Sequence, residues 1–127
     1  MQNKSIIVAL DTTNLGDTKL LLDQLDPNLC MIKIGSVSFN SLGREVVTEV
    51  SNKGFDVFLD LKLHDIPNTV KKSIEGLADL PITMMTVHTS GGLRMLQESL
   101  DAVKDTNIKI FGVTALTSLA DEDTQTI

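Results

Sequence analysis

Cysteine and long apolar runs are scarce in this sequence. Its one cysteine, Cys30, cannot form a disulfide within the chain, and no cluster of cysteine and histidine has the spacing of a zinc site. The apolar run from Ile6 to Leu10 ends at Asp11. It is too short for a signal peptide, and a membrane span needs about 20 apolar residues. We therefore expect a cytoplasmic protein without a membrane anchor, since free thiols suit a reducing compartment.

Positive charge is also scarce. The chain has 11 lysine and arginine residues against 17 aspartate and glutamate residues, which gives a net charge of −6 with neutral histidines. Binding of nucleic acid needs a basic stripe that contacts phosphates, so we do not expect nucleic acid as a partner. Aromatic residues make up only 3% of the chain, but 42% of the residues are hydrophobic. That fraction is enough for the core of a globular domain.

Short apolar runs rich in β-branched residues recur along the chain. Stretches with helical periodicity separate them, and the interval between successive runs is 24 to 27 residues. Strands of about five residues that alternate with helices predict βαβ units and a parallel sheet, and so an α/β fold. The five runs begin at Ile6, Cys30, Phe55, Ile82 and Ile108.

Single residues predict two helix boundaries. Pro67 precedes the periodic residues Val70 and Ile74, and proline is favoured in the first turn of a helix. Gly54 follows a stretch that runs from Leu42 through Val50, and glycine is favoured just after a helix ends. We therefore expect one helix that begins at Pro67 and one that ends before Gly54.

A Rossmann-type sheet and a (β/α)8 barrel both alternate strands with helices. The residues at the strand ends distinguish these two folds. No GxGxxG follows the first strand and no GxxxxGK[ST] occurs, so the phosphate loops of nucleotide-binding sheets are missing. Polar residues instead end nearly every strand, as is typical of the C-terminal face of a TIM, or (β/α)8, barrel. These residues are Asp11, Lys33, Asp60, Lys62, His88, Thr114 and Thr117.

The length of the chain fits only part of such a barrel. A complete barrel has about 250 residues, whereas the fifth run here ends near residue 113 of 127. We therefore expect residues 1–127 to be the N-terminal portion of a single (β/α)8 domain, roughly its first five βα units. An open barrel of this kind should expose strand edges and apolar faces.

Charged residues of alternating sign gather at the end of the third strand. Side chains alternate along a strand, so Asp60 and Lys62 share the inner face and lie about 6.6 Å apart along the backbone. Lys33 of the second strand lies at the same C-terminal end of the barrel, and Asp65 follows just before the next helix. Opposite charges in contact keep each other ionised. A structural ion-pair network is the alternative, but burying four charges for stability alone is unfavourable.

Residues 60–69, DLKLHDIPNT, resemble the DxKxxDIPxT signature of the orotidine 5′-phosphate decarboxylase family. The similarity extends to VALD at residues 8–11, IKIG at 32–35, VHTSGG at 87–92 and VTALTS at 113–118. It implies decarboxylation of orotidine 5′-phosphate to uridine 5′-phosphate, a step of pyrimidine biosynthesis, without metal or organic cofactor. The family's phosphate-binding loops after the sixth to eighth strands have no counterpart here, so the resemblance implies that these 127 residues alone are inactive.

The resemblance also implies roles for individual residues. Lys62 would donate the proton to C6 of the pyrimidine, and Asp60 would lie near the departing carboxylate and hold Lys62 charged. Lys33 and Asp11 would bind the ribose hydroxyls, and Thr117 would help to hold the nucleotide.

Members of the family are homodimers, and the resemblance implies that part of each site comes from the partner. Asp65, Ile66 and Thr69 would reach into the site of the partner subunit. His64 and His88 are expected to be supporting residues, with His64 in a structural hydrogen bond.

Three alternatives remain open. Magnesium-dependent sugar-phosphate decarboxylases and synthases of the same superfamily also use an Asp-x-Lys-x-x-Asp strand end, although the segment from Ile66 to Thr69 favours the nucleotide enzyme. A Schiff-base aldolase that uses Lys62 is less consistent with the flanking carboxylates, which keep the amine protonated. A non-catalytic half-barrel module for assembly is the third alternative.

Overall fold

Parallel strands alternate with helices along the whole of the chain that the computed structural model describes, residues 4–125. Residues 1–3 and 126–127, at the two ends of the expected domain, lie outside the described residues. Each strand begins within two residues of the start of an expected apolar run, so the repeat is confirmed. The five strands are β1 (Ile6–Leu10), β2 (Cys30–Gly35), β3 (Val57–Leu63), β4 (Met84–His88) and β5 (Lys109–Val113).

Helices fill the segments between the strands. The helix after β3 begins at Pro67, as expected from the sequence, and the residue Gly54 follows the helix before β3 in a left-handed conformation. The helices are α1 (Leu15–Asp23), α2 (Ser36–Leu42), α3 (Arg44–Asn52), α4 (Pro67–Leu77), α5 (Leu93–Ala102) and α6 (Asp121–Gln125), with a short 3-10 helix η1 (Thr89–Gly91) before α5.

The segment between β2 and β3 differs from the expected single helix. It forms two helices, α2 and α3, because the chain turns at Gly43 with φ 68° and ψ −152°. Residues other than glycine are almost never found in this backbone region. Periodicity alone did not predict the break, since apolar residues continue on one face from Leu42 to Val50.

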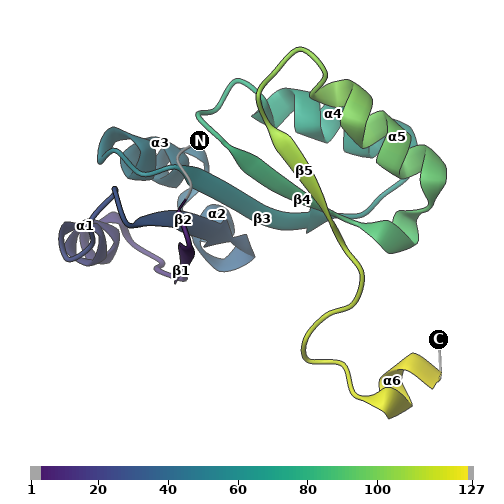
Figure 1. Cartoon of the computed structure of the whole chain (residues 1–127), viewed down its shortest axis with the longest axis horizontal. Coiled ribbons are helices and arrows are strands. Elements are labelled where there is room, and N and C mark those ends of the chain that lie inside the picture. Colours follow the sequence, from purple (N-terminus) through teal and green to yellow (C-terminus); the bar gives the residue numbers. More distant parts are fainter. Residues whose placement is uncertain (1–3, 126–127) are drawn as a thin grey trace.

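The strands follow one another in the sheet in sequence order, β1-β2-β3-β4-β5, and each neighbouring pair is parallel (Figure 1). A nucleotide-binding doubly wound sheet reverses its strand order, whereas a barrel adds each strand beside the last. The chain therefore forms the first five βα units of a (β/α)8 barrel, as the sequence predicts.

The hydrophobic core lies between the sheet and the helices. Alternate strand residues such as Ile34, Leu59 and Val87 are fully buried against Val47 of α3 and Ile74 of α4. The opposite face of the sheet, which would line the barrel interior, is open. There Phe58 and Phe111 contact each other with ring centroids 6.4 Å apart.

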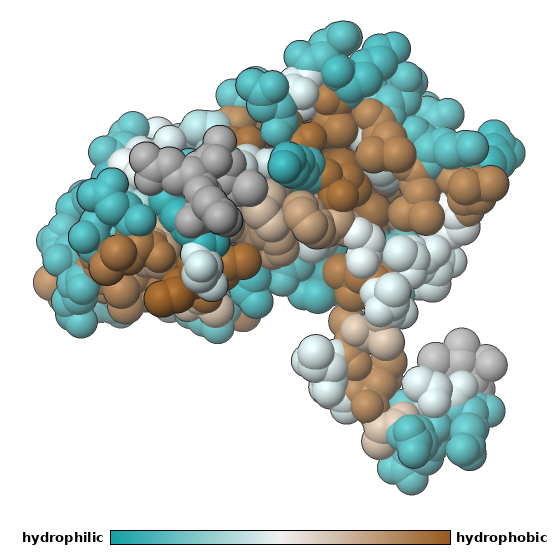
Figure 2. All heavy atoms as spheres, in the orientation of Figure 1, coloured by the Kyte–Doolittle hydropathy of each residue, from teal (hydrophilic) through white to brown (hydrophobic). Residues whose placement is uncertain are grey.

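Apolar residues come to the surface on the open side of the sheet, along β1 and β5. Ile7 is 48% exposed and Phe111 is 46% exposed. Figure 2 shows apolar residues at the surface over β5. The expectation that an open barrel exposes apolar surface is thus confirmed.

Ion pairs connect the helices of successive βα units. Each joins a lysine or arginine in or directly after one helix to an aspartate in or closely after the helix of a neighbouring unit, with nitrogen–oxygen distances of 2.6 Å. The pairs are Asp23–Lys53 between α1 and α3, Arg44–Asp79 between α3 and the end of α4, and Lys71–Asp101 between α4 and α5.

Beyond β5 the chain leads away from the sheet to α6 (Figure 1). Residues 114–120 are exposed, and α6 starts at the acidic run from Asp121 to Asp123. Within residues 4–125, none of the helices has the length and apolar character needed to cross a membrane.

Candidate active site

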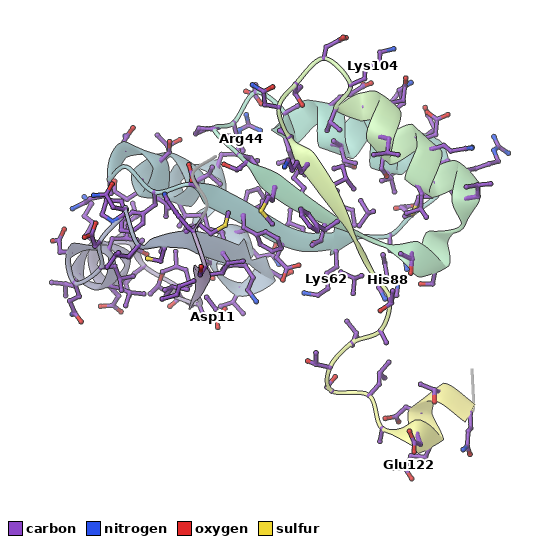
Figure 3. All side chains as sticks on the ribbon, viewed as in Figure 1. Asp11, Arg44, Lys62, His88, Lys104 and Glu122 are labelled. Carbon is purple, nitrogen blue, oxygen red and sulfur yellow. The ribbon has the colours of Figure 1, made fainter. Side chains whose placement is uncertain are left out.

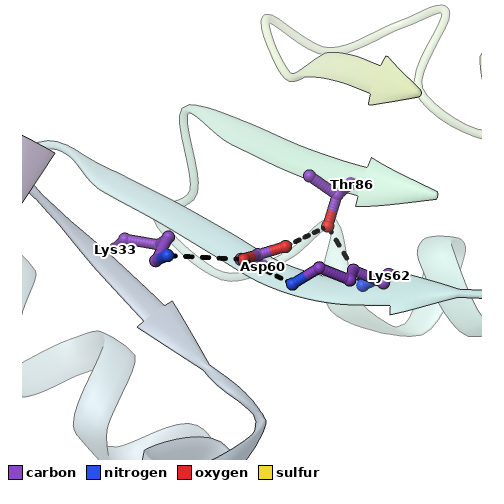
Figure 4. A network of polar contacts seen from close by, with 4 residues as sticks. All are labelled: Lys33, Asp60, Lys62 and Thr86. Carbon is purple, nitrogen blue, oxygen red and sulfur yellow. Dashed lines mark hydrogen bonds and ion pairs between the residues drawn. The ribbon is translucent and has the colours of Figure 1, made fainter. Parts of the chain in front are cut away.

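Two lysines and one aspartate meet at the C-terminal ends of β2 and β3. Lys62 Nζ lies 2.8 Å from Asp60 Oδ2, and Lys33 Nζ lies 3.7 Å from the same oxygen (Figure 4). The Asp60 side chain is only 9% exposed, whereas the side chains of Lys33 and Lys62 are 37% and 38% exposed. The carboxylate is therefore at the base of the cluster, and the two ammonium groups face the open side.

Thr86 of β4 is a fourth member of this cluster, and sequence reasoning missed it. Its hydroxyl donates to Asp60 Oδ1 at 2.7 Å and accepts a hydrogen bond from the backbone N–H of Lys62 at 3.0 Å (Figure 4). Thr86 is the single hydroxyl residue within Met84–His88, a strand that is otherwise apolar up to His88. A polar side chain on the inner face of the neighbouring strand was the signal that could have identified it.

The backbone of β3 is irregular where the cluster forms. The pairing of β3 with β4 shifts register between Leu59 and Leu63, and Lys62 has a left-handed φ of 49°. Leu61 and Leu63 nevertheless pack against the core on the helix side. Lys62 therefore stays on the inner face, beside Asp60, as alternation along the strand predicts.

The cluster keeps Asp60 ionised. Burial by itself raises the pKa of the Asp60 carboxyl, but hydrogen bonds from Lys62 and Thr86 and the charges of Lys62 and Lys33 outweigh it, so that the pKa is lowered overall. The Oδ2 atom of this ionised carboxylate lies within ion-pair distance of both amines. The arrangement can therefore hold an ammonium group in place to donate a proton.

Lys33, Asp60 and Lys62 line a pocket of about 370 Å³. Its other wall is the loop that follows β5. Thr117, which the sequence analysis assigned to the site, lies in this wall with Ser118, so the structure places Thr117 with Lys33, Asp60 and Lys62. The remaining lining residues are Val113, Ala115 and Leu116.

Asp11 and the residues around Asp65 lie outside this pocket. Asp11 follows β1 and is exposed; Figure 3 labels it near the end of that strand. The Asp65 carboxylate accepts a hydrogen bond from the N–H of Ile66 at 2.7 Å. In the described residues no hydrogen bond or ion pair joins Asp65 to the cluster, so the structure brings together three of the four expected charges.

The segment of Asp65 borders a second, open pocket of about 440 Å³. Ile66 is 67% exposed there, and Thr69 is exposed in the first turn of α4, where its N–H bonds to the carbonyl of Ile66 at 3.0 Å. These residues are thus exposed and are not among those that line the pocket of the cluster.

His64 and His88 stack beside the second pocket. Their ring centroids are 5.4 Å apart with an interplanar angle of 20°. Nδ1 of His88 also contacts the hydroxyl of Ser90 and accepts a hydrogen bond from its N–H at 3.3 Å. The sequence predicted a structural hydrogen bond for His64; the structure shows instead a ring contact between the residue after β3 and the last residue of β4.

A metal site is not evident among the side chains of residues 4–125. No group of three or more histidine, cysteine, aspartate and glutamate residues in this range is arranged to hold a metal ion. Cys30 is buried in the core and free.

Comparisons with known proteins give one consistent family. Residues 4–127 match the family described as "Orotidine 5′-phosphate decarboxylase / HUMPS family". The chain is 46% identical over 120 residues to the orotidine 5′-phosphate decarboxylase of Saccharophagus degradans, with 93% of this chain and 50% of that protein covered. It is 47% identical over 127 residues to the enzyme of that name from Mannheimia succiniciproducens, with 97% and 53% covered.

Solved structures agree with the sequence comparisons. The crystal structure of orotidine 5′-phosphate decarboxylase from Lactobacillus acidophilus has a TM-score of 0.87 and 34% identity, over 97% of this chain and 58% of that one. The enzyme from Methanocaldococcus jannaschii, complexed with the inhibitor BMP, has a TM-score of 0.84 over 96% and 56% of the two chains; at 23% identity it shows the fold alone. The chain spans about half the length of the curated relatives it matches.

Proposed function

The chain belongs to the orotidine 5′-phosphate decarboxylase / HUMPS family, and on this premise we propose that it supplies the proton-donating lysine of an enzyme that converts orotidine 5′-phosphate to uridine 5′-phosphate. The observation that carries the proposal is the contact of Lys62 with Asp60, 2.8 Å long, at the C-terminal ends of parallel strands. This end of a barrel is where catalytic groups gather.

The proposed reaction has to stabilise a carbanion. The bond between C6 of the pyrimidine and its carboxylate breaks, carbon dioxide leaves, and the electron pair stays on C6. An ammonium group close to C6 stabilises the developing negative charge and then donates a proton to it. Lys62 becomes a neutral amine in this step and takes up a proton from solvent afterwards.

Asp60 is proposed to prepare Lys62 for the proton transfer. The lowered pKa of Asp60 keeps its carboxylate ionised, and the carboxylate holds the Lys62 ammonium in position. Lys33 shares the same carboxylate oxygen at 3.7 Å and is exposed enough to contact a ligand.

The nucleotide is proposed to occupy the pocket of about 370 Å³ over this cluster. Lys33 and Asp11 would bind the ribose hydroxyls, and Thr117 would contact the nucleotide from the loop after β5. The exposed positions of Asp11 and Thr117 suit these roles, because both side chains are open to solvent.

A homodimer is proposed as the working assembly. Asp65, Ile66 and Thr69 are exposed and do not line the pocket of their own chain's cluster, which suits a contribution to the site of a partner. A two-fold interface would place these residues in both sites at once. We propose a cytoplasmic location, in keeping with the buried free thiol of Cys30.

The activity belongs to a protein longer than the part matched here, since the chain covers 50% of the Saccharophagus degradans relative. Binding energy from remote groups of a substrate, such as its phosphate, helps to organise the reacting centre. By resemblance, later loops of the barrel hold that phosphate. The 127 residues by themselves are therefore proposed to be inactive.

The test uses a joined protein, in which this chain is followed by the second half of the Saccharophagus degradans relative. Lys62→Ala should reduce decarboxylation by about 1,000-fold or more, because proton donation and charge stabilisation are lost together, while uridine 5′-phosphate still binds. Lys19→Ala, a change of an exposed lysine on α1, is the matched control and should leave turnover unchanged.

Either of two results would overturn the proposal. One is near-normal turnover by Lys62→Ala. The other is a folded, nucleotide-binding joined protein that turns over a sugar phosphate with magnesium but leaves orotidine 5′-phosphate intact. The second result would favour the sugar-phosphate branch of the superfamily.

A further inference from the structure

We propose that Thr86 is a positioning residue for this site, whose single hydroxyl fixes both the carboxylate of Asp60 and the backbone of Lys62. The proposal rests on the proposed decarboxylation for its kinetic consequence. Its structural part concerns the chain alone.

The hydroxyl of Thr86 is placed to serve two groups at once. Thr86 is 4% exposed, so water does not reach the hydroxyl freely. A hydroxyl has one hydrogen to donate and two lone pairs that accept. The hydrogen goes to Asp60 Oδ1 at 2.7 Å, and one lone pair accepts the N–H of Lys62 at 3.0 Å.

The first bond fixes the rotation of the Asp60 carboxylate relative to the lysines. With Oδ1 engaged by Thr86, Oδ2 faces the open side and contacts both Lys62 at 2.8 Å and Lys33 at 3.7 Å. Rotation of the carboxylate away from this orientation would break the bond to Thr86 and turn Oδ2 away from the two ammonium groups. Thr86 therefore sets the direction in which Lys62 points.

The second bond supports an unusual backbone. Lys62 has a φ of 49° and lies in the segment where β3 and β4 shift register. A residue with a side chain adopts this conformation at a cost, and surrounding contacts have to maintain it. Thr86 contributes such a contact by accepting the N–H of Lys62 itself.

Threonine suits this task better than serine because its branched side chain is restricted at χ1. Valine has nearly the same shape but no hydroxyl. Thr86→Val therefore removes both hydrogen bonds while keeping the packing, and Thr86→Ser keeps the hydroxyl. Thr83→Val is the matched control, since Thr83 precedes the same strand at its other end and has no side-chain hydrogen bond.

The first experiment follows the ionisation of Asp60 by carbon-13 NMR in the 127-residue chain. Thr86→Val should raise the pKa of Asp60 relative to the unchanged chain, because one of the bonds that lower it is gone. Thr86→Ser and Thr83→Val should leave the pKa of Asp60 unchanged. A role in packing alone would change stability but would not move this titration, so an unmoved midpoint in Thr86→Val overturns the proposal.

The second experiment measures decarboxylation by the joined protein. Loss of a hydrogen bond to a charged group predicts a decrease of about tenfold or more in kcat for Thr86→Val, with KM nearly unchanged, and Thr86→Ser should restore most of the loss. Equal losses in the serine and valine variants would overturn the proposal. If Thr86→Val does not fold, Thr86→Ala is compared with Thr86→Ser in both experiments.

The two proposals can fail separately. If the joined protein binds nucleotide but does not decarboxylate orotidine 5′-phosphate, the proposed function fails, whereas the Asp60 titration still reports on Thr86. If the joined protein is active and Thr86→Val has normal kcat, only the role of Thr86 fails.

Discussion

Lys62 combines a charged side chain with a backbone conformation that suits glycine. At a φ of 49° the Cβ atom crowds the backbone, so part of the cost of forming the site lies in this residue. The cost is local, because the neighbouring residues Leu61 and Leu63 retain their packing against the core. It can be measured by comparing two variants that both lack the ammonium group.

Lys62→Gly should be more stable than Lys62→Ala by about 1 kcal/mol, because glycine accepts a positive φ whereas alanine keeps the crowded Cβ. Urea unfolding followed by circular dichroism measures the difference, since the chain has no tryptophan or tyrosine for fluorescence. Both variants lose the same ion pair with Asp60, so that loss cancels. An alanine variant as stable as the glycine variant would contradict the assignment of strain to Lys62.

Asp60 predicts a specific dependence of stability on pH. Its pKa is lowered in the folded chain, so its ionised form contributes stability that is fully present above the unfolded value of 3.8 and is lost as pH falls through the folded value. Asp60→Asn should therefore be less stable near neutral pH, by about 2 kcal/mol for a bond to a charged group. Below pH 3.8 the difference should shrink. Urea unfolding from pH 7 to pH 3 tests this, and a constant difference would contradict it.

Strands were easier to predict than the features that shape the site. Apolar runs bounded by polar residues set the position of each strand, and alternation set which residues face inward, so Lys33, Asp60 and Lys62 could be grouped before the fold was known. The register shift in β3 could not be predicted, because it depends on contacts with β4 that are distant in sequence. Thr86 was missed although its polar side chain on the inner face of β4 was a signal, because the two groups that it bonds lie on another strand.

Some helix boundaries could likewise be predicted from the sequence, and others could not. Pro67 predicts the start of α4 because proline restricts the local backbone. The break at Gly43 was missed, because glycine is compatible with both helix and turn and the apolar face continues across it. Asp65 was grouped with the lysines from its distance along the chain, but it lines a different pocket and its carboxylate accepts a hydrogen bond from the local backbone.

The entry to α5 supplies a test of local packing. A Cβ at Gly91 would lie 2.0 Å from the sulfur of Met95, which is fully buried. Gly91→Ala should therefore destabilise the chain by about 1–3 kcal/mol, as overpacking of a core does. Gly76→Ala is the matched control, because nothing lies within 4 Å of its added Cβ and alanine favours the helix. Urea unfolding compares the two, and equal effects would show that Met95 moves aside freely.

The open side of the sheet governs the behaviour of the whole chain. Apolar residues of β1 and β5 are exposed there, with Ile7 at 48% and Phe111 at 46%. Exposed apolar surface of this kind promotes association and binding of hydrophobic dyes. The described part of the chain thus has a complete core on the helix side of the sheet and an uncovered face on the other.

Mixing the 127-residue chain with the second half of a relative should show whether the chain is active alone or needs that half. The 127-residue chain alone should bind a hydrophobic dye and show no decarboxylation, and addition of the separately produced second half of a relative should reduce dye binding and yield activity. Light scattering, dye fluorescence and turnover of orotidine 5′-phosphate follow the three effects. Activity in the unmixed chain would contradict the proposal that the remaining loops are needed.

The strand order of the sheet has a consequence for synthesis on the ribosome. Each strand pairs with the one made just before it, and ion pairs join the helices of consecutive units. A growing polypeptide can therefore dock each βα unit as it emerges, without waiting for a distant segment, because its contacts are close in sequence. The nascent chain would hold Lys33, Asp60, Lys62 and Thr86 together once the fourth strand leaves the exit tunnel.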